Sequence, residues 1–292
     1  MPELPEVETI KRGLEKEIVG TRIVDVVFLW NKTLKNKNPK IAATKIVGKK
    51  IISIKRRAKI IIINLEGGLN LLFHMKMTGH LIIAPASTKI KNNGQWVSNQ
   101  EELKDPFNQY IRLIVYLDNN KLIAFSDLRK FGYLKIISNT ELEKILSEYG
   151  PEPFSKDFNV NYLKKILSNK KIAIKKALLD QKTISGIGNI YADEILFASK
   201  INPLKTASKV SEKELNSIIQ NTKKILRKSI ELGGTSTSDF RNIKGDRGLY
   251  GNRLKVYKKN GRSCTICHSE IKRMVVGGRG THFCPKCQEL ND

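Results

Sequence analysis

The sequence predicts an α+β protein: an N-terminal helix with an antiparallel β-sandwich, then a helical domain, then a C-terminal β-hairpin that carries four cysteines. Three observations support this prediction. The first half is rich in short β-branched runs separated by turns. After Gly150–Pro153 the apolar residues recur at helical spacing instead. All four cysteines lie beyond residue 263 in two close pairs. We therefore expect domains at residues 1–149, 150–245 and 246–292.

The first half begins with an expected helix over Pro5–Ile18, followed by seven strands. One face of this helix is apolar, formed by Val7, Ile10, Leu14 and Ile18. The strands are expected at Arg22–Leu29, Lys50–Lys55, Ile60–Asn64, Asn70–Phe73, Tyr110–Tyr116, Lys121–Phe125 and Tyr133–Ile137. Many antiparallel strands with short turns favour a sandwich or a flattened barrel. The polar segment Ala86–Phe107 interrupts this pattern, and we expect a mobile surface insertion there.

Helices are expected after residue 153. They are a first helix with the stripe Val160, Leu163, Ile166 and Leu167, a basic helix over Lys170–Lys182, a third that runs to about Ala198, and a long one over Ser211–Leu232. Asn189 follows a tight turn with two glycines and can cap the third helix. Ser211 and Glu214 form a capping box for the fourth. Two helices joined by a turn with two glycines can present backbone N–H groups to a phosphate, although most turns of this kind only join two helices.

The chain carries a large positive charge. Lysine and arginine number 53 against 28 acidic residues, which gives a net charge of +25. A basic surface binds phosphate backbones by releasing counterions, so nucleic acid is an expected partner. The alternative is a lysine-rich composition of the kind that AT-rich genomes produce, so charge alone identifies no activity. No apolar stretch approaches membrane-spanning length and no signal-peptide layout is present, so we expect a cytoplasmic protein without a membrane partner.

The first six residues, Met1 to Glu6, allow two interpretations. Removal of Met1 ahead of a small residue would leave Pro2 as a free secondary amine. An α-amino group has a pKa of roughly 7.7–8.0, so a neutral fraction can attack a carbonyl near pH 7. A proline adduct is an iminium with a fixed positive charge, and Glu3 and Glu6 would stand nearby as acids or bases. In the second interpretation the prolines only shape the start of a helix, where acids favour the positive end.

The cysteines fall into two Cys-x-x-Cys corners, formed by Cys264, Cys267, Cys284 and Cys287. Two such corners suit tetrahedral zinc–thiolate coordination. Four thiolates leave no open position for chemistry, so we expect one structural Zn2+. The alternatives are two disulfides or four free thiols, and disulfides are disfavoured in a cytosolic chain. His268 and His282 are not expected to be ligands, because four cysteines already satisfy the metal.

Between the corners the sequence predicts a β-hairpin. The segments Arg273–Val276 and Thr281–Phe283 would be its strands, joined by the glycine-rich turn Gly277–Gly280. Glycines let such a turn approach a surface closely. Arg279 at the tip would then be offered to a phosphate, which its planar guanidinium suits.

Together these motifs resemble those of bacterial formamidopyrimidine-DNA glycosylases, in the Fpg/Nei superfamily, over essentially the whole chain. The motifs are Pro2–Thr9 (PELPEVET), Arg56–Lys59 (RRAK), His74–Gly79 (HMKMTG), Asp127–Gly132 (DLRKFG), Gly186–Tyr191 (GIGNIY) and the four-cysteine finger with Arg279. The combination is highly specific, whereas only the N-terminus is specific by itself. The resemblance implies a monomeric enzyme that excises oxidised purines such as 8-oxoguanine from double-stranded DNA. It also implies that the helical domain is a helix-two-turn-helix domain.

The resemblance implies roles at the N-terminus. Pro2 would be the nucleophile that attacks C1′ of the damaged nucleotide, Glu3 its acid/base, and Glu6 an anchor of the helix and its site. The iminium would act as an electron sink, and elimination would break the strand on both sides of the sugar. Lys59 and Arg279 would complete the catalytic set. By residue type alone, the basic run that ends at Lys59 would instead be interpreted as a solvated strand end.

A damaged base cannot be reached inside a duplex, so the resemblance implies that it is flipped out. Met77, Arg129 and Phe131 match the three residues that the family inserts into the gap. Apolar wedges lower the cost of unstacking, and an arginine can address the orphaned opposite base. By sequence alone, Met77 and Phe131 would be interpreted as core residues of strands.

The resemblance also implies contacts to the phosphates and to the flipped base. Asn189 and Arg279 would hold phosphates near the lesion, Tyr191 would support that contact, and His74 would be a further DNA-binding residue. The segment Gly233–Gly245 matches a flexible loop that closes over the flipped base. Its small polar residues suit such a loop and equally suit plain disorder.

Three positions depart from the family pattern. Lys76 stands where a small residue is usual, Leu128 replaces the usual proline before Arg129, and the insertion Ala86–Phe107 is longer than usual. These departures concern the wedge and the discrimination of the opposite base, not the reaction.

Two other functions remain as alternatives. Endonuclease-VIII-like enzymes remove oxidised pyrimidines and usually begin Pro-Glu-Gly-Pro-Glu, so Leu4 favours the purine enzyme. A non-catalytic zinc-finger DNA-binding protein would be expected to lack Pro2, Glu3 or Lys59, and this chain has all three.

Overall fold

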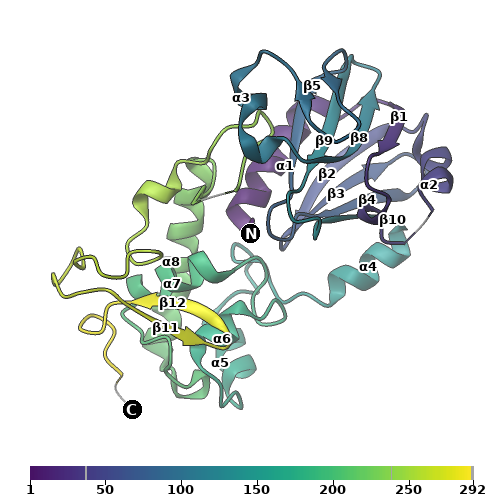
Figure 1. Cartoon of the computed structure of the whole chain (residues 1–292). Coiled ribbons are helices and arrows are strands. Elements are labelled where there is room, and N and C mark those ends of the chain that lie inside the picture. Colours follow the sequence, from purple (N-terminus) through teal and green to yellow (C-terminus); the bar gives the residue numbers. More distant parts are fainter. Residues whose placement is uncertain (37, 238, 291–292) are drawn as a thin grey trace. The chain divides into compact units, whose positions relative to one another are not determined.

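The computed structural model describes residues 1–36, 38–237 and 239–290, and it divides the chain into two compact units. Unit 1 comprises Met1–Leu146 with Ile230–Gly251, and unit 2 comprises Ser147–Ser229 with Asn252–Asp292. Figure 1 labels the elements of both units. The division differs from the three predicted ranges. Phe240 belongs to the core of unit 1, whereas the cysteine hairpin contacts the helices of unit 2.

Unit 1 contains helix α1 (Leu4–Ile18) and two four-stranded antiparallel sheets, with strand orders β1-β8-β9-β5 and β10-β4-β3-β2. The strands are β1 (Ile23–Phe28), β2 (Ile51–Arg57), β3 (Ile60–Leu65), β4 (Leu69–His74), β5 (His80–Pro85), β8 (Ile111–Leu117), β9 (Lys121–Ser126) and β10 (Tyr133–Ser138). The predicted helix and all seven predicted strands are confirmed, with small shifts at their ends. Strand β5 was not predicted.

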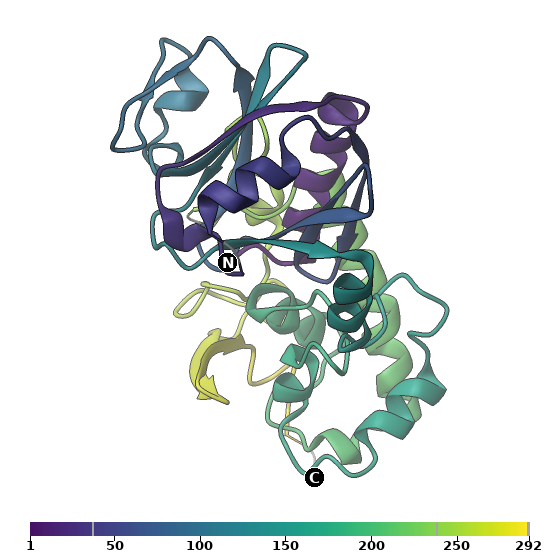
Figure 2. The same ribbon diagram turned by 90° about the vertical axis from the view of Figure 1, so that its right-hand side faces the viewer.

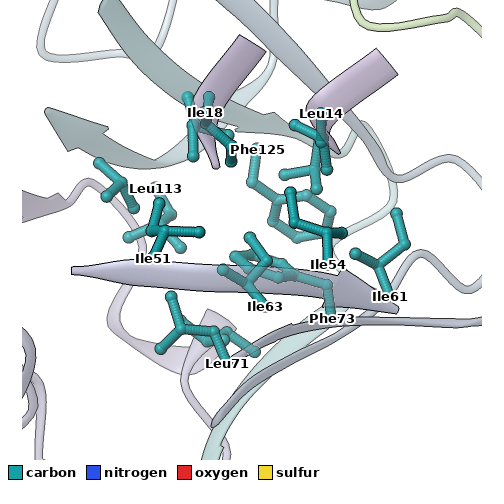
Figure 3. Close-up of a cluster of buried hydrophobic side chains, with 14 of the residues drawn as sticks. Leu14, Ile18, Ile51, Ile54, Ile61, Ile63, Leu71, Phe73, Leu113 and Phe125 are labelled. Atoms are coloured by element: carbon teal, nitrogen blue, oxygen red, sulfur yellow. The ribbon is translucent and has the colours of Figure 1, made fainter. Parts of the chain in front are cut away.

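The core of unit 1 lies between the two sheets and α1. Helix α1 contacts β2, β3 and β5, and Figures 1 and 2 show it in purple beside the sheets. Figure 3 shows Leu14 and Ile18 of the helix above the inward side chains of both sheets, including Phe73 and Phe125. The two phenylalanine rings lie 5.8 Å apart in a tilted arrangement. Burial of this apolar face fixes the direction of α1 and therefore the position of its N-terminal end.

The segment Ala86–Phe107 is attached to the outer face of the first sheet. It forms β6 (Lys89–Ile90), β7 (Trp96–Val97), helix α3 (Glu101–Lys104) and the short helix η2 (Pro106–Asn108). Trp96 and Leu103 are buried against apolar residues of β5, β8 and β9. The expectation of a mobile surface insertion is therefore wrong for these anchoring residues, because two large apolar side chains are removed from water there.

Two further elements of unit 1 were not predicted. The chain between β1 and β2 contains the short helix η1 (Asn31–Thr33) and helix α2 (Pro39–Ile46). Pro39 stands in the first turn of α2, where a proline costs no hydrogen bond, and the Asn38 side chain caps it by accepting the Lys40 N–H at 3.0 Å.

Unit 2 is helical, with the cysteine hairpin packed against its helices. Its elements are α5 (Val160–Leu167), α6 (Ile174–Leu179), α7 (Asn189–Ala198), η3 (Ala207–Lys209), the greater part of α8 (Glu212–Glu231), and the hairpin β11 (Lys272–Val276) and β12 (Arg279–Phe283). Helix α4 (Asn139–Ser147) and η4 (Tyr250–Arg253) lie at the unit boundaries in the sequence. Figure 2 shows the hairpin in yellow.

The predicted helices of unit 2 are confirmed with one correction. The capping box of α8 is present, since Ser211 N–H donates to Glu214 Oε2 at 2.8 Å and Glu214 N–H donates to Ser211 Oγ at 3.3 Å. The basic helix is much shorter than Lys170–Lys182, because Ala173 is extended and pairs with Thr206. No helix in the described part of the chain is long and apolar enough to cross a membrane.

Candidate functional site

Two acids, Glu3 and Glu6, are buried at the start of α1. One carboxylate oxygen of Glu6 accepts the Glu3 N–H at 2.8 Å, which is part of a capping box. The other oxygen accepts the Thr235 N–H at 2.7 Å. Pro2 directly precedes this pair and is also buried. Its nitrogen is an amide while Met1 is attached, so an amine at this position requires the removal of Met1.

Arg56 connects this helix to the turn that carries Lys59. Its Nε donates to Glu8 Oε2 at 2.8 Å, and its Nη1 donates to the Ala58 carbonyl at 3.1 Å. Ala58 adopts a left-handed backbone with φ of 52°, which turns the chain from β2 into β3. Lys59 follows it and is buried. The interpretation of a solvated basic strand end is therefore wrong.

His74 ends β4 and pairs with Ile60, the residue after Lys59. Burial, with smaller contributions from the charges of Lys76 and Lys59, lowers the pKa of His74 from 6.5 to about 3. The ring is therefore neutral at pH 7. Its Nδ1 accepts the Lys76 N–H at 3.0 Å, so the ring proton resides on Nε2. This neutral N–H donor is suited to a phosphate oxygen.

The structure brings Met77, Arg129 and Phe131 together on the surface of unit 1. Arg129 Nη1 lies 3.1 Å from Met77 Sδ, and the guanidinium lies 4.9 Å from the centre of the Phe131 ring. Met77 is 37% exposed and Phe131 is 52% exposed. Their interpretation as core residues of strands is therefore wrong. An exposed apolar pair around a cation is suited to stacked bases and phosphates.

Asp127 holds the backbone beneath this cluster. Its Oδ2 accepts the Gly132 N–H at 2.7 Å, and its Oδ1 accepts the Arg129 N–H at 3.2 Å and the Thr78 hydroxyl. A Cβ on Gly132 would lie 2.5 Å from the Phe125 ring, so only glycine fits there. One carboxylate therefore joins the turn after β4 to the turn after β9.

In unit 2 the carbonyl of Gly280, next to Arg279, accepts two hydrogen bonds. Asn189 Nδ2 donates to it at 2.9 Å and Lys175 Nζ at 3.2 Å. Asn189 keeps a second amide proton for another acceptor. Arg279 is exposed at the start of β12, after the left-handed pair Gly277 and Gly278. The predicted hairpin is confirmed.

A buried ion pair attaches the hairpin to the helices of unit 2. Lys175 Nζ lies 2.6 Å from Asp193 Oδ1, and both side chains are fully buried. Lys175 also donates to Thr281 Oγ1 at 2.8 Å. The second oxygen of Asp193 accepts the His282 N–H at 2.9 Å. Buried charges are tolerated when every charged atom has a partner, and here the partners belong to α6, α7 and β12.

One expectation in unit 2, the capping role of Asn189, needs correction, whereas the supporting role expected of Tyr191 stays a prediction. Asn189 does not cap α7, because Gly188 occupies the capping position and the Asn189 side chain instead points to Gly280. Tyr191 is fully buried, and its hydroxyl lies 2.6 Å from Ser229 Oγ. In this structure Tyr191 has no exposed surface for a direct DNA contact, so it can only support its neighbours.

The four cysteine sulfurs form one cluster. All four lie within 4.8 Å of one another, with the Cys264–Cys287 pair 3.8 Å apart and the Cys267–Cys284 pair 3.4 Å apart. Sulfurs placed about 2.3 Å from one tetrahedral zinc ion lie roughly 3.8 Å apart, so the cluster fits the metal. His282 faces Asp193 instead of this cluster.

Sequence reasoning missed the side chains that support these groups, chiefly Arg56, Asp127, Lys175 and Asp193. A signal for one of them was available: Asp193 and Glu194 interrupt the otherwise apolar helix α7. Glu194 is buried, which raises its pKa, and it accepts the N–H groups of residues 255, 256 and 257.

Family models match three parts of the chain. The formamidopyrimidine-DNA glycosylase N-terminal domain matches residues 1–134, the H2TH domain of the same glycosylase matches residues 149–241, and a zinc finger found in FPG and IleRS matches residues 261–290. The last match and the cluster geometry agree on one structural zinc site, formed by the four cysteines.

Full-length relatives and solved structures agree with these models. The formamidopyrimidine-DNA glycosylases of Carboxydothermus hydrogenoformans and Herpetosiphon aurantiacus are 38% and 36% identical, each over 99% of this chain and 100% of its own length. Lactococcus lactis Fpg, solved with abasic-site DNA, is 32% identical with a TM-score of 0.87. A structure of MutM with DNA containing carbocyclic 8-oxo-G is 33% identical with a TM-score of 0.87. Both matches cover 99% of this chain and 100% of the other.

Proposed function

The chain belongs to the formamidopyrimidine-DNA glycosylase family, and from this we propose that it removes oxidised purines, including 8-oxoguanine and formamidopyrimidines, from double-stranded DNA and then cleaves the abasic site. The observation that supports this most strongly is the pair of buried acids, Glu3 and Glu6, directly after Pro2. We also propose that the protein acts as a monomer in the bacterial cytoplasm, associated with the nucleoid through DNA.

The proposed reaction begins when Met1 has been removed. The Pro2 nitrogen attacks C1′ of the damaged nucleotide, the glycosidic bond breaks, and the base leaves with a proton. Glu3 moves protons during base loss and ring opening, which gives an iminium between Pro2 and C1′. The iminium withdraws electrons from the sugar, so loss of a proton from C2′ expels the 3′ phosphate. A second elimination expels the 5′ phosphate, and water releases the product from Pro2.

We propose that the surface cluster of unit 1 fills the gap that the flipped base leaves. Met77 and Phe131 would act as apolar wedges, and the Arg129 guanidinium would hydrogen-bond the orphaned base. The cluster is exposed while its backbone is held by Asp127, which suits insertion into a duplex. Because Lys76 lies beside this cluster and Leu128 within the loop, the strength of opposite-base discrimination is a property to measure.

We propose that both units contact phosphates through hydrogen-bond donors. In unit 1 these are Lys59 and the neutral His74, whose Nε2–H is suited to a phosphate oxygen. In unit 2 they are the second amide proton of Asn189 and the guanidinium of Arg279, supported from the core by Tyr191. The zinc ion, held by the four cysteines, would stabilise the hairpin that carries Arg279 and take no part in the reaction.

A borohydride trapping experiment tests the nucleophile. Borohydride reduces an iminium to a stable amine, so the wild-type protein should become covalently attached to DNA with 8-oxoguanine or an abasic site. Pro2→Gly should not be trapped if the secondary amine is required, because the imine of a primary amine lacks the fixed positive charge of the proline iminium. A protein with Met1 retained, or with an N-terminal tag, is the matched control: it should bind DNA and leave it uncut. Persistent trapping of Pro2→Gly would show that the secondary amine of Pro2 is not required, and trapping of the protein with Met1 retained would show that another amine is the nucleophile.

An excision assay tests the substrate class. The wild-type enzyme should act on formamidopyrimidine and on 8-oxoguanine opposite cytosine, and more slowly on thymine glycol. A preference for thymine glycol would instead indicate the endonuclease-VIII-like activity. Binding to all these duplexes without excision or trapping would indicate a non-catalytic DNA-binding protein.

A further inference from the structure

Near its end, the long insertion after β5 forms an ion pair with the segment that follows α8, in which the arginine is fully buried and the aspartate is partly exposed. Arg241 is fully buried, and its guanidinium lies 5.0 Å from the centre of the Phe107 ring. Its Nε and Nη2 donate to Asp105 Oδ2 at 2.9 and 2.7 Å, and Nη2 also reaches Oδ1 at 2.9 Å. A planar pairing of this kind fixes the orientation of the guanidinium as well as its distance from the carboxylate. The two residues are 136 positions apart in the chain, so the pair is a tertiary anchor.

Asn108 forms a second anchor beside the first. It is fully buried, and its Nδ2 donates to the carbonyls of Glu102 at 2.6 Å and Gly245 at 3.3 Å. Its Oδ1 accepts from His80 Nε2 at 2.8 Å. Because Asn108 Nδ2 donates to two carbonyls, the atom that faces His80 is the acceptor Oδ1, and His80 Nε2 is therefore the donor. Asp105 of the insertion and Asn108, directly after it, therefore hold the segment at Arg241 and at Gly245.

The same segment is attached to the core of unit 1. Phe240 and Ile243 are buried in that core, and the Ile243 carbonyl accepts the Ile83 N–H of β5 at 2.8 Å. A Cβ on Gly13 of α1 would lie 2.7 Å from Ile243, so the helix and this segment are in close contact. Phe240 and Ile243 are therefore packed in the core, although the sequence predicted a flexible loop over Gly233–Gly245.

Hydrogen bonds continue from Arg241 towards the start of α1. Arg241 Nη1 donates to the Phe240 carbonyl at 2.8 Å, and Ser236 Oγ donates to the same carbonyl at 2.7 Å. Ser236 Oγ also accepts the Gly248 N–H at 2.8 Å. Arg241 therefore fixes the position of Ser236 through one shared carbonyl oxygen.

The residue before Ser236 reaches the two buried acids. Thr235 N–H donates to Glu6 at 2.7 Å, and Glu6 accepts the Glu3 N–H at 2.8 Å. Gly234 has a φ of +85°, and a Cβ there would lie 3.0 Å from Glu6 Cγ. The close approach therefore requires glycine. A continuous path of described contacts leads from the insertion to Glu3.

We propose that Arg241, paired with Asp105, is a positioning residue for the proposed acid/base. It holds the Thr235 N–H on Glu6 and, through Glu6, the orientation of Glu3. The insertion, whose length departs from the family pattern, supplies the other half of this support. The inference rests on the proposed function of Glu3. Small displacements of a catalytic group lower the rate of chemistry without weakening substrate binding when the binding residues stay in place.

Steady-state excision of 8-oxoguanine by Asp105→Asn and Arg241→Met tests this proposal. We expect kcat to fall by roughly tenfold to a hundredfold while KM stays unchanged. The matched control is Glu101→Gln in the same insertion, whose carboxylate pairs with the exposed Lys104 and has no link to the path. Its kcat should equal that of the wild type. Unchanged kcat in both test variants would overturn the proposal.

A double variant separates positioning from folding. Asp105→Leu combined with Arg241→Met replaces the buried arginine and its partly exposed partner by apolar groups, which leaves no unpaired charge in the interior and often restores stability. It cannot restore the hydrogen bond to the Phe240 carbonyl, because methionine has no donor. We expect thermal stability to recover while kcat stays low. Recovery of both would mean that the ion pair only supports folding, and would overturn the proposal.

A double-mutant cycle tests transmission through Glu6. If the path acts through this carboxylate, Arg241→Met should lower kcat much less in a Glu6→Gln background than in the wild type. If the effects of Arg241→Met and Glu6→Gln on kcat are additive, Arg241 does not act through Glu6. Failure of the proposed function is distinguishable, because the wild-type protein would then neither excise nor be trapped, whereas failure of this inference leaves the wild type active and the Arg241→Met variant equally active.

Discussion

Replacement of Asp193 by alanine tests how the hairpin that carries Arg279 is held. The change removes the acidic partner of the buried Lys175 ammonium, whose contacts to the Gly280 carbonyl at 3.2 Å and Thr281 Oγ1 at 2.8 Å are to neutral groups. It also removes the acceptor of the His282 N–H. Removing one partner of a fully buried ion pair costs about 3–5 kcal/mol, which corresponds to roughly a hundredfold to a few thousandfold in the local opening equilibrium.

Amide hydrogen exchange of the β11–β12 hairpin measures this opening directly. Both tryptophans, Trp30 and Trp96, lie in unit 1, so tryptophan fluorescence follows the other unit and serves as the internal control. We expect faster exchange in the hairpin, weaker DNA binding, and an unchanged fluorescence transition. The matched control is Glu270→Ala, which removes the exposed partner of Lys272 and should change stability by less than about 1 kcal/mol.

Two outcomes would refute this reasoning. One is a loss of protection in Asp193→Ala no larger than in Glu270→Ala. The other concerns the double variant Lys175→Met with Asp193→Leu, in which apolar groups replace both charges. Such replacements are often neutral or stabilising, so the double variant should be more stable than Asp193→Ala. If it is less stable, the cost does not come from an unpaired buried charge.

Three further predictions concern His74, the wedge and the metal. The folded-state pKa of His74, about 3, lies below its ordinary value of 6.5, so neutral His74 contributes stability that is complete above pH 6.5 and is lost as the pH falls towards 3. His74→Gln should therefore reduce the acid sensitivity of unfolding in that window, measured by denaturation at several pH values. Phe131→Ala should slow excision of 8-oxoguanine without lowering stability, whereas Ile41→Ala, which shortens an exposed apolar side chain on α2, should do neither. Chelation of zinc should weaken DNA binding in a titration and leave the trapping of DNA already bound unchanged, and slower trapping would contradict a purely structural metal.

The predictable part of the fold is the part with regular patterns. Helix α1 has an apolar face at helical spacing, and seven strands have β-branched runs between turns. Strand β5 was missed because His80–Pro85 is a short continuous apolar run, which periodicity cannot assign. Helix α6 was predicted too long because its basic residues suit a helix, whereas the tertiary pairing of Ala173 with Thr206 extends the chain before it.

The candidate site also has a part that the sequence predicts and a part that it does not. Motifs identify the residues that would contact DNA, because those residues lie close together in sequence. Their supports could not be predicted, since partners such as Asp105 and Arg241 are brought together only by the complete fold. One signal was available in the insertion: Trp96 is a large apolar residue in a polar segment, and such a residue usually needs a surface to cover.

In each unit, hydrogen bonds to the backbone fix the position of an arginine that is proposed to contact DNA. If Arg129 and Arg279 contact DNA as proposed, their side chains must be able to move while their backbones stay in place. In each case the fixed group is in the backbone: Asp127 accepts the Arg129 N–H, and Asn189 and Lys175 donate to the carbonyl next to Arg279. Among the described residues, the guanidinium of Arg129 contacts the Met77 sulfur and the Phe131 ring, and both contacts are weak and easily exchanged. Because the backbone is already ordered, binding has to restrict only the side chains, which lowers the entropy cost of forming the complex.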